Sequence, residues 1–314
     1  MRPISKSALS VQYDLRPAKQ VERRMFVDAF QRLAQAGFKI RDYQYTGFGG
    51  IYFVDFIIFH TLLGISKMVS MEHDESLENR VKFNCPFKCV EVKIDVSTNI
   101  IPTLTQDGKH ILWLDYDDSV NSAILDDVYL AGSQLSCGSI LLITVDVEPP
   151  DKEYDKPKAS QEYFNIEAGK YTGTLSVSEF TKSKLPNTNK SVLIQALKDG
   201  MSGRTDTEYL PMFHFQYADG HKMLTIGGVI GSSSEKQALR NMNRDGAEYL
   251  RTKPDSEPYE IKVPPFTRKE RYLLDSHMPC GDGWQPDNFE FPVGHIEIYR
   301  EIYRYLPVYA ELLI

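Results

Sequence analysis

Between residues 39 and 145, short strand-like runs of apolar residues alternate with segments of helical spacing, and this alternation restricts the fold more than any other feature. The fifth run, Ser139 to Val145, is predominantly apolar without alternation, which is typical of a strand covered by helices on both faces. Repeated strand–helix units predict an α/β fold with a doubly wound sheet of five parallel strands. The predicted strands are 39–45, 67–72, 88–94, 111–114 and 139–145, and the predicted helices lie within 51–63, 76–82 and 120–135.

An antiparallel hairpin is predicted to close this parallel sheet. Two alternating runs between Met212 and Ile230 flank Asp219 and Gly220, which form a strong turn signal. The preceding segment, 151–191, is polar and lysine-rich and has no sustained periodicity, so we expect a surface-lying insertion. The main domain is therefore predicted to span 39–232.

Helical segments are predicted on both sides of the main domain, as a cap at 1–38 and an extension at 233–314. In the cap, apolar residues recur at helical spacing between Ala18 and Gly37. In the extension, Thr267 is a plausible N-cap, and a helix rich in Ile and Tyr is expected between Gly294 and Leu306. The tail tyrosines either pack on the domain, as terminal helices usually do, or form a substrate wall or a homodimer surface.

The N-terminal helix also carries a group of basic residues, Arg16, Lys19, Arg23 and Arg24. Such a group can receive a phosphate or a polynucleotide. It can equally form the solvated face of an amphipathic helix. The helical spacing favours the solvated face.

Composition narrows the class of protein. The 314 residues include 36 Lys and Arg and 43 Asp and Glu, a net charge of −7, which does not favour binding to nucleic acid by bulk charge. No apolar run reaches the roughly 20 residues that span a bilayer, and no apolar signal core follows Met1. Four cysteines are too few for a disulfide framework, and Cys85 and Cys89 lack a second pair for zinc. We therefore expect a cytoplasmic protein with reduced thiols, no membrane segment and no assigned metal ligands.

The turn after the first predicted strand is rich in glycine. Gly47, Gly49 and Gly50 permit a tight turn and a close approach of the backbone to a ligand. The dinucleotide fingerprint G-x-G-x-x-G is not met, because its third glycine falls on Tyr52. A nicotinamide-dependent dehydrogenase is therefore the least favoured enzyme class.

Acidic residues end the second and third predicted strands. In open α/β sheets, ligands bind at the carboxyl ends of the strands, near the point where strand order reverses. Glu72 lies 23 residues after Gly49, about the spacing at which an acid accepts hydrogen bonds from a ribose. Asp95 can meet an adenine amino group, although an acid that caps a loop explains it nearly as well.

The fourth predicted strand ends in Asp115, Tyr116, Asp117 and Asp118, at the expected switch point of the sheet. Asp115 can orient a substrate or accept a proton, and Tyr116 can stack on a bound group. The carboxylates together can hold a divalent cation. Alternatively, Asp117 and Asp118 cap the next helix. Asp115, Tyr116 and Asp117 are the candidate catalytic residues.

The pattern from Lys39 to Ile230 resembles the class I S-adenosylmethionine-dependent methyltransferase superfamily, a Rossmann-like fold closed by an antiparallel hairpin. The resemblance implies S-adenosyl-L-methionine as cofactor and a glycine turn that wraps it. Where that superfamily usually has an acid before the turn, this chain has Gln44 and Tyr45. The cofactor contacts implied are Tyr45, Gly47, Gly49, Gly50, Glu72, Asp95 and Asp115.

Three phrases are similar to bacterial proteins described as O-methyltransferases: LRPAKQVERR at 15–24, YTGFGGIYFVDF at 45–56 and WLDYDD at 113–118. The N-P-P-Y phrase that accompanies methylation of base amino groups does not follow the fourth strand. The resemblance thus implies a methyltransferase directed to oxygen, with its acceptor unassigned.

Two other functions remain open. A cofactor-binding regulatory or assembly subunit would keep the fold without transfer, and the missing acid before Gly47 favours it. A metal-dependent hydrolase would use the carboxylates of 115–118.

Overall fold

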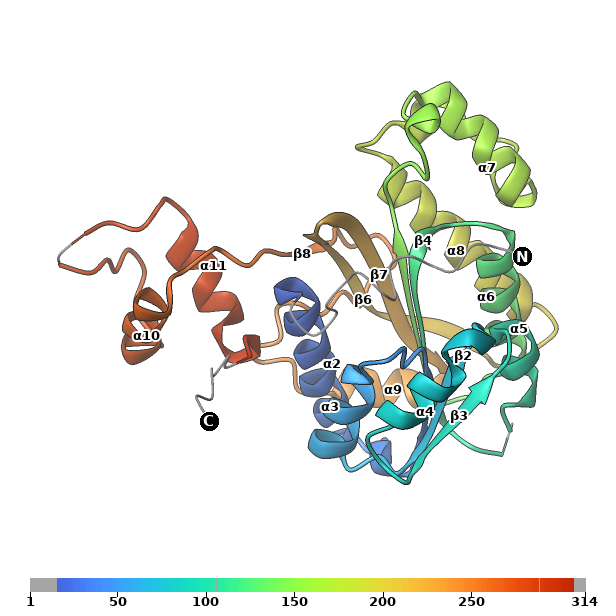
Figure 1. Ribbon diagram of the computed structural model, residues 1–314, viewed down its shortest axis with the longest axis horizontal. Helices are drawn as coiled ribbons and strands as arrows, with labels where there is room; N and C mark the ends of the chain where they lie inside the picture. The colour runs from blue at the N-terminus through green and yellow to red at the C-terminus, as the bar shows by residue number, and fades with distance from the viewer. Residues whose placement is uncertain (1–15, 106, 288, 308–314) are drawn as a thin grey trace.

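The computed structural model describes residues 16–105, 107–287 and 289–307, which form one eight-stranded sheet with helices on both faces (Figure 1). The sequence predicted seven strands. The strand order is β3-β2-β1-β4-β5-β7-β6-β8. The strands are β1 (Gln44–Gly47), β2 (Lys67–Glu72), β3 (Val90–Ile94), β4 (His110–Ser119), β5 (Ser139–Asp146), β6 (Glu208–Asp219), β7 (His221–Gly231) and β8 (Tyr259–Ile261).

The order of the strands reverses beside β1. The chain passes from β1 through β2 to β3 on one side and then returns to β4 on the other, and all these neighbours pair in parallel. The carboxyl ends of β1 and β4 therefore flank the switch point, where open α/β sheets bind ligands.

The predicted hairpin is confirmed: β6 and β7 pair antiparallel around Gly220, which has a φ of +109°. The strand that the sequence did not predict, β8, pairs in parallel with β6. It has three residues and lies in the Pro-rich segment 251–265, which was expected to be a connection. So short an edge strand carries too few residues to show a period.

Helices cover both faces of the sheet. The α-helices are α2 (Pro17–Gln35), α3 (Val54–Leu63), α4 (Glu78–Asn84), α5 (Ser97–Ile100), α6 (Ser122–Gln134), α7 (Pro157–Thr172), α8 (Leu185–Met201), α9 (Ser233–Asn241), α10 (Arg268–His277) and α11 (His295–Ile302). Two buried hydrophobic clusters result, one on each face.

The first face is covered by α2 and α3 and is rich in aromatic side chains. Phe26 of α2 lies with its ring centroid 5.0 Å from Trp113 of β4 and 4.8 Å from Phe213 of β6, both edge to face. Phe30 continues the contact one turn later, against Phe59 of α3. Edge-to-face pairs of buried rings stabilise the fold beyond the contribution of the apolar area that they bury. They fix α2 across the middle of the sheet.

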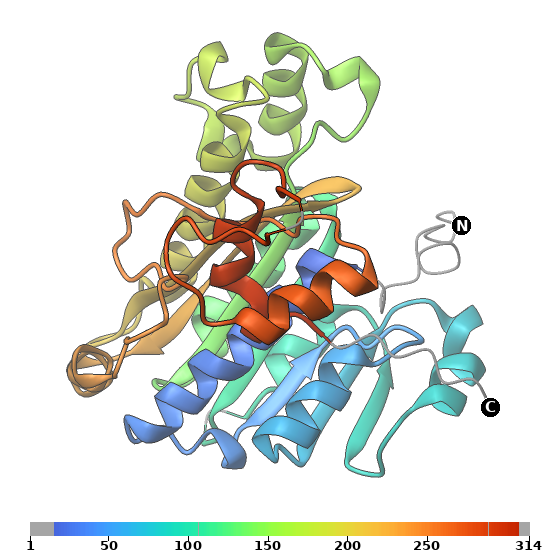
Figure 2. The ribbon, with the colours of Figure 1, turned by 90° about the vertical axis from the view of Figure 1, so that its left-hand side faces the viewer.

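The second face is covered by α6 and α8, whose backbones cross closely at Gly132 and Gly200. The prediction that 151–191 lies on the surface is wrong in part, because Phe164, Phe180 and Leu185 are buried. Pro186 near the start of α8 and the many lysines concealed this apolar pattern. The earlier helix, α7, does project beyond the sheet (Figure 2).

The C-terminal extension contains α10 and α11, which lie to one side of the sheet (Figure 1). The predicted N-cap is confirmed, because Thr267 Oγ1 accepts a hydrogen bond from Glu270 N at 3.2 Å in a capping box. Gly294 precedes α11 as predicted. Across the described part of the chain, every helix is too short or too polar to span a bilayer.

Candidate active site

The sheet register places two acidic residues symmetrically about the glycine turn. Gly47 of β1 pairs with Ser70 of β2 on one side and with Trp113 of β4 on the other. Glu72 and Asp115 each lie two residues past these partners. Because side chains alternate along a strand, both carboxylates share the face covered by α2 and α3. The structure thus brings these two predicted residues to one edge.

The glycine turn packs directly against β2. Gly49 N donates a hydrogen bond to Ser70 Oγ at 3.2 Å. A Cβ at Gly49 would lie 2.5 Å from that oxygen and 2.8 Å from the ring of Phe53, so a larger residue is excluded. Gly50 has a φ of +53° and open space around it. A ligand can therefore approach the backbone at Gly50.

Tyr45, which the sequence analysis included among the cofactor contacts, has a fully buried side chain. Its ring lies edge to face with Phe56 and Phe59 of α3, at centroid distances of 4.8 and 4.9 Å. The Tyr45 hydroxyl lies against Gly47 but is fully buried, so the solvent-facing part of the turn is formed by the glycines.

Glu72 and Asp95 meet at the ends of β2 and β3, where Asp95 N donates to the backbone oxygen of Glu72 at 2.9 Å. Glu72 Oε1 accepts from Asp74 N at 3.0 Å, and the Glu72 side chain is 11% exposed. Asp95 Oδ1 accepts from Val96 N and from Asn99 Nδ2, each at 2.8 Å. One oxygen of Asp95 thus caps the following turn, as the alternative interpretation expected.

Tyr116 is tied to a buried carboxylate. Its hydroxyl donates to Asp127 of α6 at 2.6 Å, and Ser97 and Thr98 at the start of α5 donate to the same carboxylate. Burial, and then the charge of Asp127, raise the pKa of Tyr116 well above its usual value. The hydroxyl therefore stays protonated, and Asp127 joins the end of β4 to the start of α5. The Tyr116 ring faces Phe48 of the glycine turn, with centroids 5.2 Å apart.

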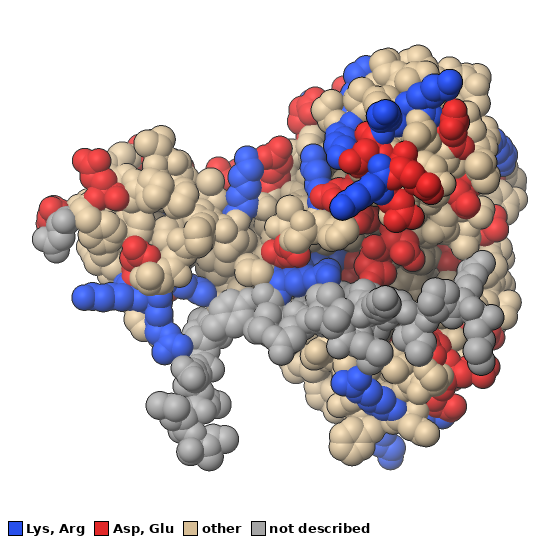
Figure 3. All heavy atoms as spheres, turned by 45° about the horizontal axis from the view of Figure 1, so that its top comes forward, with Lys and Arg blue, Asp and Glu red and all other residues tan. Residues whose placement is uncertain are grey.

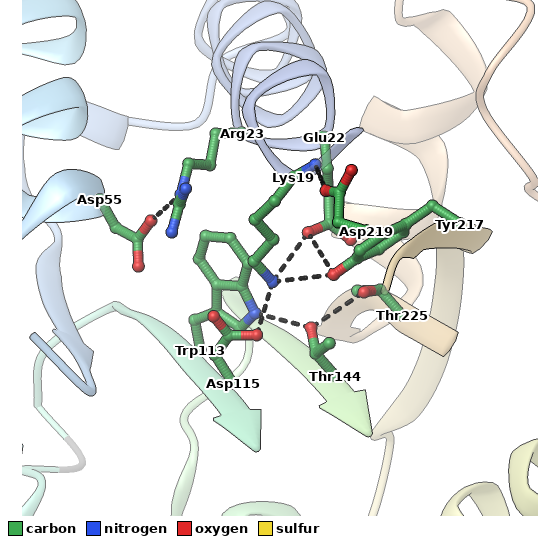
Figure 4. A network of polar contacts seen from close by, with 10 residues as sticks. All are labelled: Lys19, Glu22, Arg23, Asp55, Trp113, Asp115, Thr144, Tyr217, Asp219 and Thr225. Atoms are coloured by element: carbon green, nitrogen blue, oxygen red, sulfur yellow. Dashed lines mark hydrogen bonds and ion pairs between the residues drawn. The ribbon is translucent and has the colours of Figure 1, made fainter. Parts of the chain in front are cut away.

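A network of buried charges lies beside Asp115 (Figure 4). Lys19 Nζ of α2 is 2.5 Å from Asp115 Oδ1 and 2.9 Å from Glu22 Oε2, and it donates to the Tyr217 hydroxyl at 3.1 Å. Arg23 forms a second ion pair with Asp55 of α3. Lys19 and Arg23 are each 3% exposed, so the prediction of a solvated helix face is wrong for both.

The pattern of the helix contained a signal for this burial. Lys19 and Arg23 precede Phe26 and Phe30 at spacings of four, three and four residues, so they continue the buried stripe toward the helix start. Burial works against the charge of Lys19, but Asp115 and Glu22 raise its pKa above the ordinary lysine value. Lys19 is therefore an ammonium at neutral pH.

The hairpin turn joins the same edge. Asp219 Oδ1 accepts from Ala18 N at 3.2 Å, and its Oδ2 accepts from Lys19 N at 2.9 Å. A carboxylate at a helix N-terminus satisfies free N–H groups and complements the helix dipole. The contact orients α2 so that Lys19 reaches β4.

Exposed acids form the outer rim. Asp117 and Asp118 are exposed. His221, whose partner the sequence did not show, has Nδ1 2.8 Å from Asp146 Oδ2. Acidic side chains gather on the face seen in Figure 3. Within the described ranges, no three His, Cys, Asp or Glu side chains are grouped to hold a metal ion.

An open groove of about 860 Å³ lies elsewhere, between β8 and α11. Its arginines have protein partners: Arg300 pairs with Asp282 at 2.6 Å, and Arg251 Nε donates to Glu257 O at 2.8 Å. Five strand spacings, roughly 24 Å, separate β8 from β1. This groove is therefore distinct from the switch-point edge.

Comparisons with solved structures found low identities. Trm1 from Pyrococcus horikoshii, solved with S-adenosyl-L-methionine, is 12% identical with a TM-score of 0.45, over 76% of this chain and 61% of that chain. TomG from Streptomyces achromogenes, an O-methyltransferase involved in tomaymycin synthesis, is 13% identical with a TM-score of 0.39, over 72% and 94%. Cofactor-bound Rv0187 from MTB is 11% identical with a TM-score of 0.42, over 73% and 87%.

No curated protein sequence matches the chain. A family model, described as Putative O-methyltransferase, matches residues 11–314. The match covers nearly the whole chain, including α2 and the C-terminal extension. The chain therefore belongs to the family that this model describes as Putative O-methyltransferase.

Proposed function

We propose that this protein transfers a methyl group from S-adenosyl-L-methionine to an oxygen atom of its acceptor, at the edge formed by β1, β2 and β4. The observation that carries the proposal is the placement of Glu72 and Asp115 at one level on either side of the Gly47 turn. The donor supplies a methyl group on an already activated sulfonium. The main task of the protein is then to hold the reacting atoms in line.

The residues at the edge suit such a donor. The close packing of Gly49 on Ser70 and the open space at Gly50 leave backbone accessible to it. Among described residues, no donor is bonded to Glu72 Oε2, which is free to accept from the ribose hydroxyls. Asp95 lies beside Glu72 and would meet the adenine, and the backbone of Tyr45 would line the turn.

Asp115, Tyr116 and Asp117 would act on the acceptor side. Because a buried ammonium holds Asp115, we assign Asp115 to orienting the reactants. The Tyr116 ring would form a wall with Phe48. Exposed Asp117 would take the proton of the acceptor hydroxyl. The acceptor oxygen would then form its bond to the methyl carbon as the bond from that carbon to the donor sulfur breaks and S-adenosylhomocysteine leaves. The paired imidazole of His221 is the competing base at this rim.

Substitution distinguishes these two bases. Asp117→Asn should lower kcat by about 100-fold, the low end of what a positioned base contributes, and leave donor affinity unchanged. An unchanged kcat in Asp117→Asn, together with a large loss in His221→Gln, would assign the proton to His221.

Radiolabelled donor tests the function itself. The purified protein is incubated with methyl-labelled S-adenosyl-L-methionine and fractionated cell extract, and labelled product is separated by chromatography. We expect transfer to one fraction, with a product that has the stability of a methyl ether or ester. Donor binding without label transfer to any fraction would favour the regulatory subunit instead. No donor binding would reject both.

The hydrolase alternative is not supported by the geometry, because Asp115 bonds to Lys19 and does not converge with Asp117 and Asp118 on a shared point. We further propose a bacterial, cytoplasmic setting. The free state of Cys85, Cys89, Cys137 and Cys280 supports the cytoplasmic part of this proposal. An acceptor other than nucleic acid, and a homodimer formed through the aromatic tail, stay predictions.

A further inference from the structure

Strand β1 reads Gln44, Tyr45, Thr46 and Gly47, so it offers no carboxylate to a cationic ligand. We propose that Asp115, positioned by Lys19, receives the ammonium group of the methionine part of the donor. This inference rests on the proposed function. It assigns α2, outside the strand–helix alternation, a direct part in the donor site.

The geometry of Asp115 leaves one carboxylate oxygen for a ligand. Its Oδ1 is 2.5 Å from Lys19 Nζ, and no donor among the described residues is bonded to its Oδ2. The side chain is 20% exposed, unlike those of Lys19 and Glu22 at 4% and 0%. Of the carboxylates of Glu22, Asp55 and Asp115, all drawn in Figure 4, that of Asp115 is therefore the most exposed.

The position of Asp115 suits the amino-acid end of the donor. Glu72 and Asp115 lie on the strands flanking β1, two residues past the level of Gly47. Two strand spacings separate β2 from β4, about 10 Å. A ligand whose ribose binds Glu72 can cross the glycine turn and present its ammonium group to Asp115.

The charges of the cluster also favour an added cation. Lys19 and Arg23 carry two positive charges, whereas Glu22, Asp55 and Asp115 can carry three negative ones. Burial raises the pKa of Glu22 and of Asp55, despite the cations beside each. A ligand ammonium at Asp115 would balance the excess carboxylate.

Lys19 is a positioning residue, and its own place is fixed from several sides. Its Nζ lies 4.4 Å from the centroid of the Trp113 ring. Trp113 Nε1 donates to Thr144 Oγ1 at 3.0 Å, and Thr144 Oγ1 is 2.9 Å from Thr225 Oγ1. The orientation of Asp115 is therefore supported by three strands as well as α2.

Calorimetry with two ligands tests the assignment. S-adenosylhomocysteine is compared with an analogue in which hydrogen replaces its amino group, and the ratio of their dissociation constants is measured. The wild type should bind S-adenosylhomocysteine about tenfold or more tightly, as expected of a charge-assisted hydrogen bond. Asp115→Asn should reduce this ratio to about threefold or less and bind the analogue with wild-type affinity.

A matched control is Asp126→Asn on exposed α6, which should keep the wild-type ratio. If Asp115→Asn does not fold, Asp115→Glu keeps the charge, moves the carboxylate by one methylene and should reduce the ratio at least threefold. The inference would be overturned if the two dissociation constants were nearly equal for the wild type. It would also be overturned if an Asp115 variant kept the wild-type ratio of dissociation constants. Failure of the wild type to bind either ligand would instead count against the proposed function.

Discussion

Lys19 Nζ and Asp115 Oδ1 are 2.5 Å apart, although the two residues are separated by 96 positions in the sequence. This contact joins the start of α2 to the end of β4, at the point where the strand order reverses. A buried ion pair can be close to neutral for stability as a pair, but removing one partner leaves an uncompensated charge. Substitution of either residue should therefore destabilise the fold, although the intact pair itself adds little stability.

Replacing Lys19 by methionine should lower the free energy of unfolding by about 3–5 kcal/mol, because Glu22 and Asp115 lose their shared cation. Urea unfolding followed by circular dichroism measures the change. Exposed Lys158 on α7 provides the control, and Lys158→Met should change stability by less than about 0.5 kcal/mol. A loss below about 1 kcal/mol for Lys19→Met would mean that the carboxylates are neutral in the folded protein.

Replacing Glu72 by glutamine should weaken binding of S-adenosylhomocysteine by about 10- to 100-fold, the range for a hydrogen bond to a charged group. The thermal midpoint of the unliganded protein should change little, because the amide oxygen of the new side chain can still accept from Asp74 N. Titration calorimetry measures the affinity. Glu91→Gln on neighbouring β3, where the side chain is exposed, is the control. Equal affinities for both variants would place the ribose elsewhere.

The crossing of α6 and α8 should not tolerate a methyl group at Gly200. A Cβ there would lie 2.1 Å from the backbone oxygen of Tyr129, and backbone cannot move as a side-chain end can. Gly200→Ala should destabilise the protein by about 1–3 kcal/mol or more. Differential scanning calorimetry measures the resulting decrease in the thermal midpoint and in stability. Gly203→Ala, with no atom within 4 Å of its Cβ, should stay within about 1 kcal/mol of the wild type.

His214 should make stability fall as the pH is lowered from 7 toward 4. Burial lowers the pKa of His214 to about 4, from an ordinary value near 6.5, and its Nδ1 lies 2.9 Å from Ser256 O. Between these values the unfolded chain binds a proton that the folded chain does not, so unfolding is favoured as pH falls.

The thermal midpoints of the wild type and of His214→Gln, measured at pH 7.5 and 5.0, check this linkage. The decrease in thermal midpoint from pH 7.5 to pH 5.0 should be larger for the wild type than for the variant. Parallel losses in both proteins would show that other groups set the pH dependence.

Much of the fold could be predicted from local pattern. The apolar run at 139–145 has no polar face, and this identifies a doubly covered strand without knowledge of its neighbours. The turn at Gly220 and the cap at Thr267 depend on residues close in sequence, and both occur as predicted. The start of α8 was missed because its charged positions obscured the periodicity that burial follows.

For the candidate site, too, some features could be predicted from the sequence and others depend on the tertiary structure. The sequence by itself determined that a glycine turn and acids at strand ends meet at one edge, because the carboxyl ends of parallel strands lie at the same edge of a sheet. Only the tertiary structure decided which atoms are committed to protein partners: Asp115 to Lys19, Tyr116 to Asp127 and Asp219 to the start of α2. These contacts join residues tens to hundreds of positions apart. Their side chains meet only through the packing of helices on the sheet, which no local periodicity specifies.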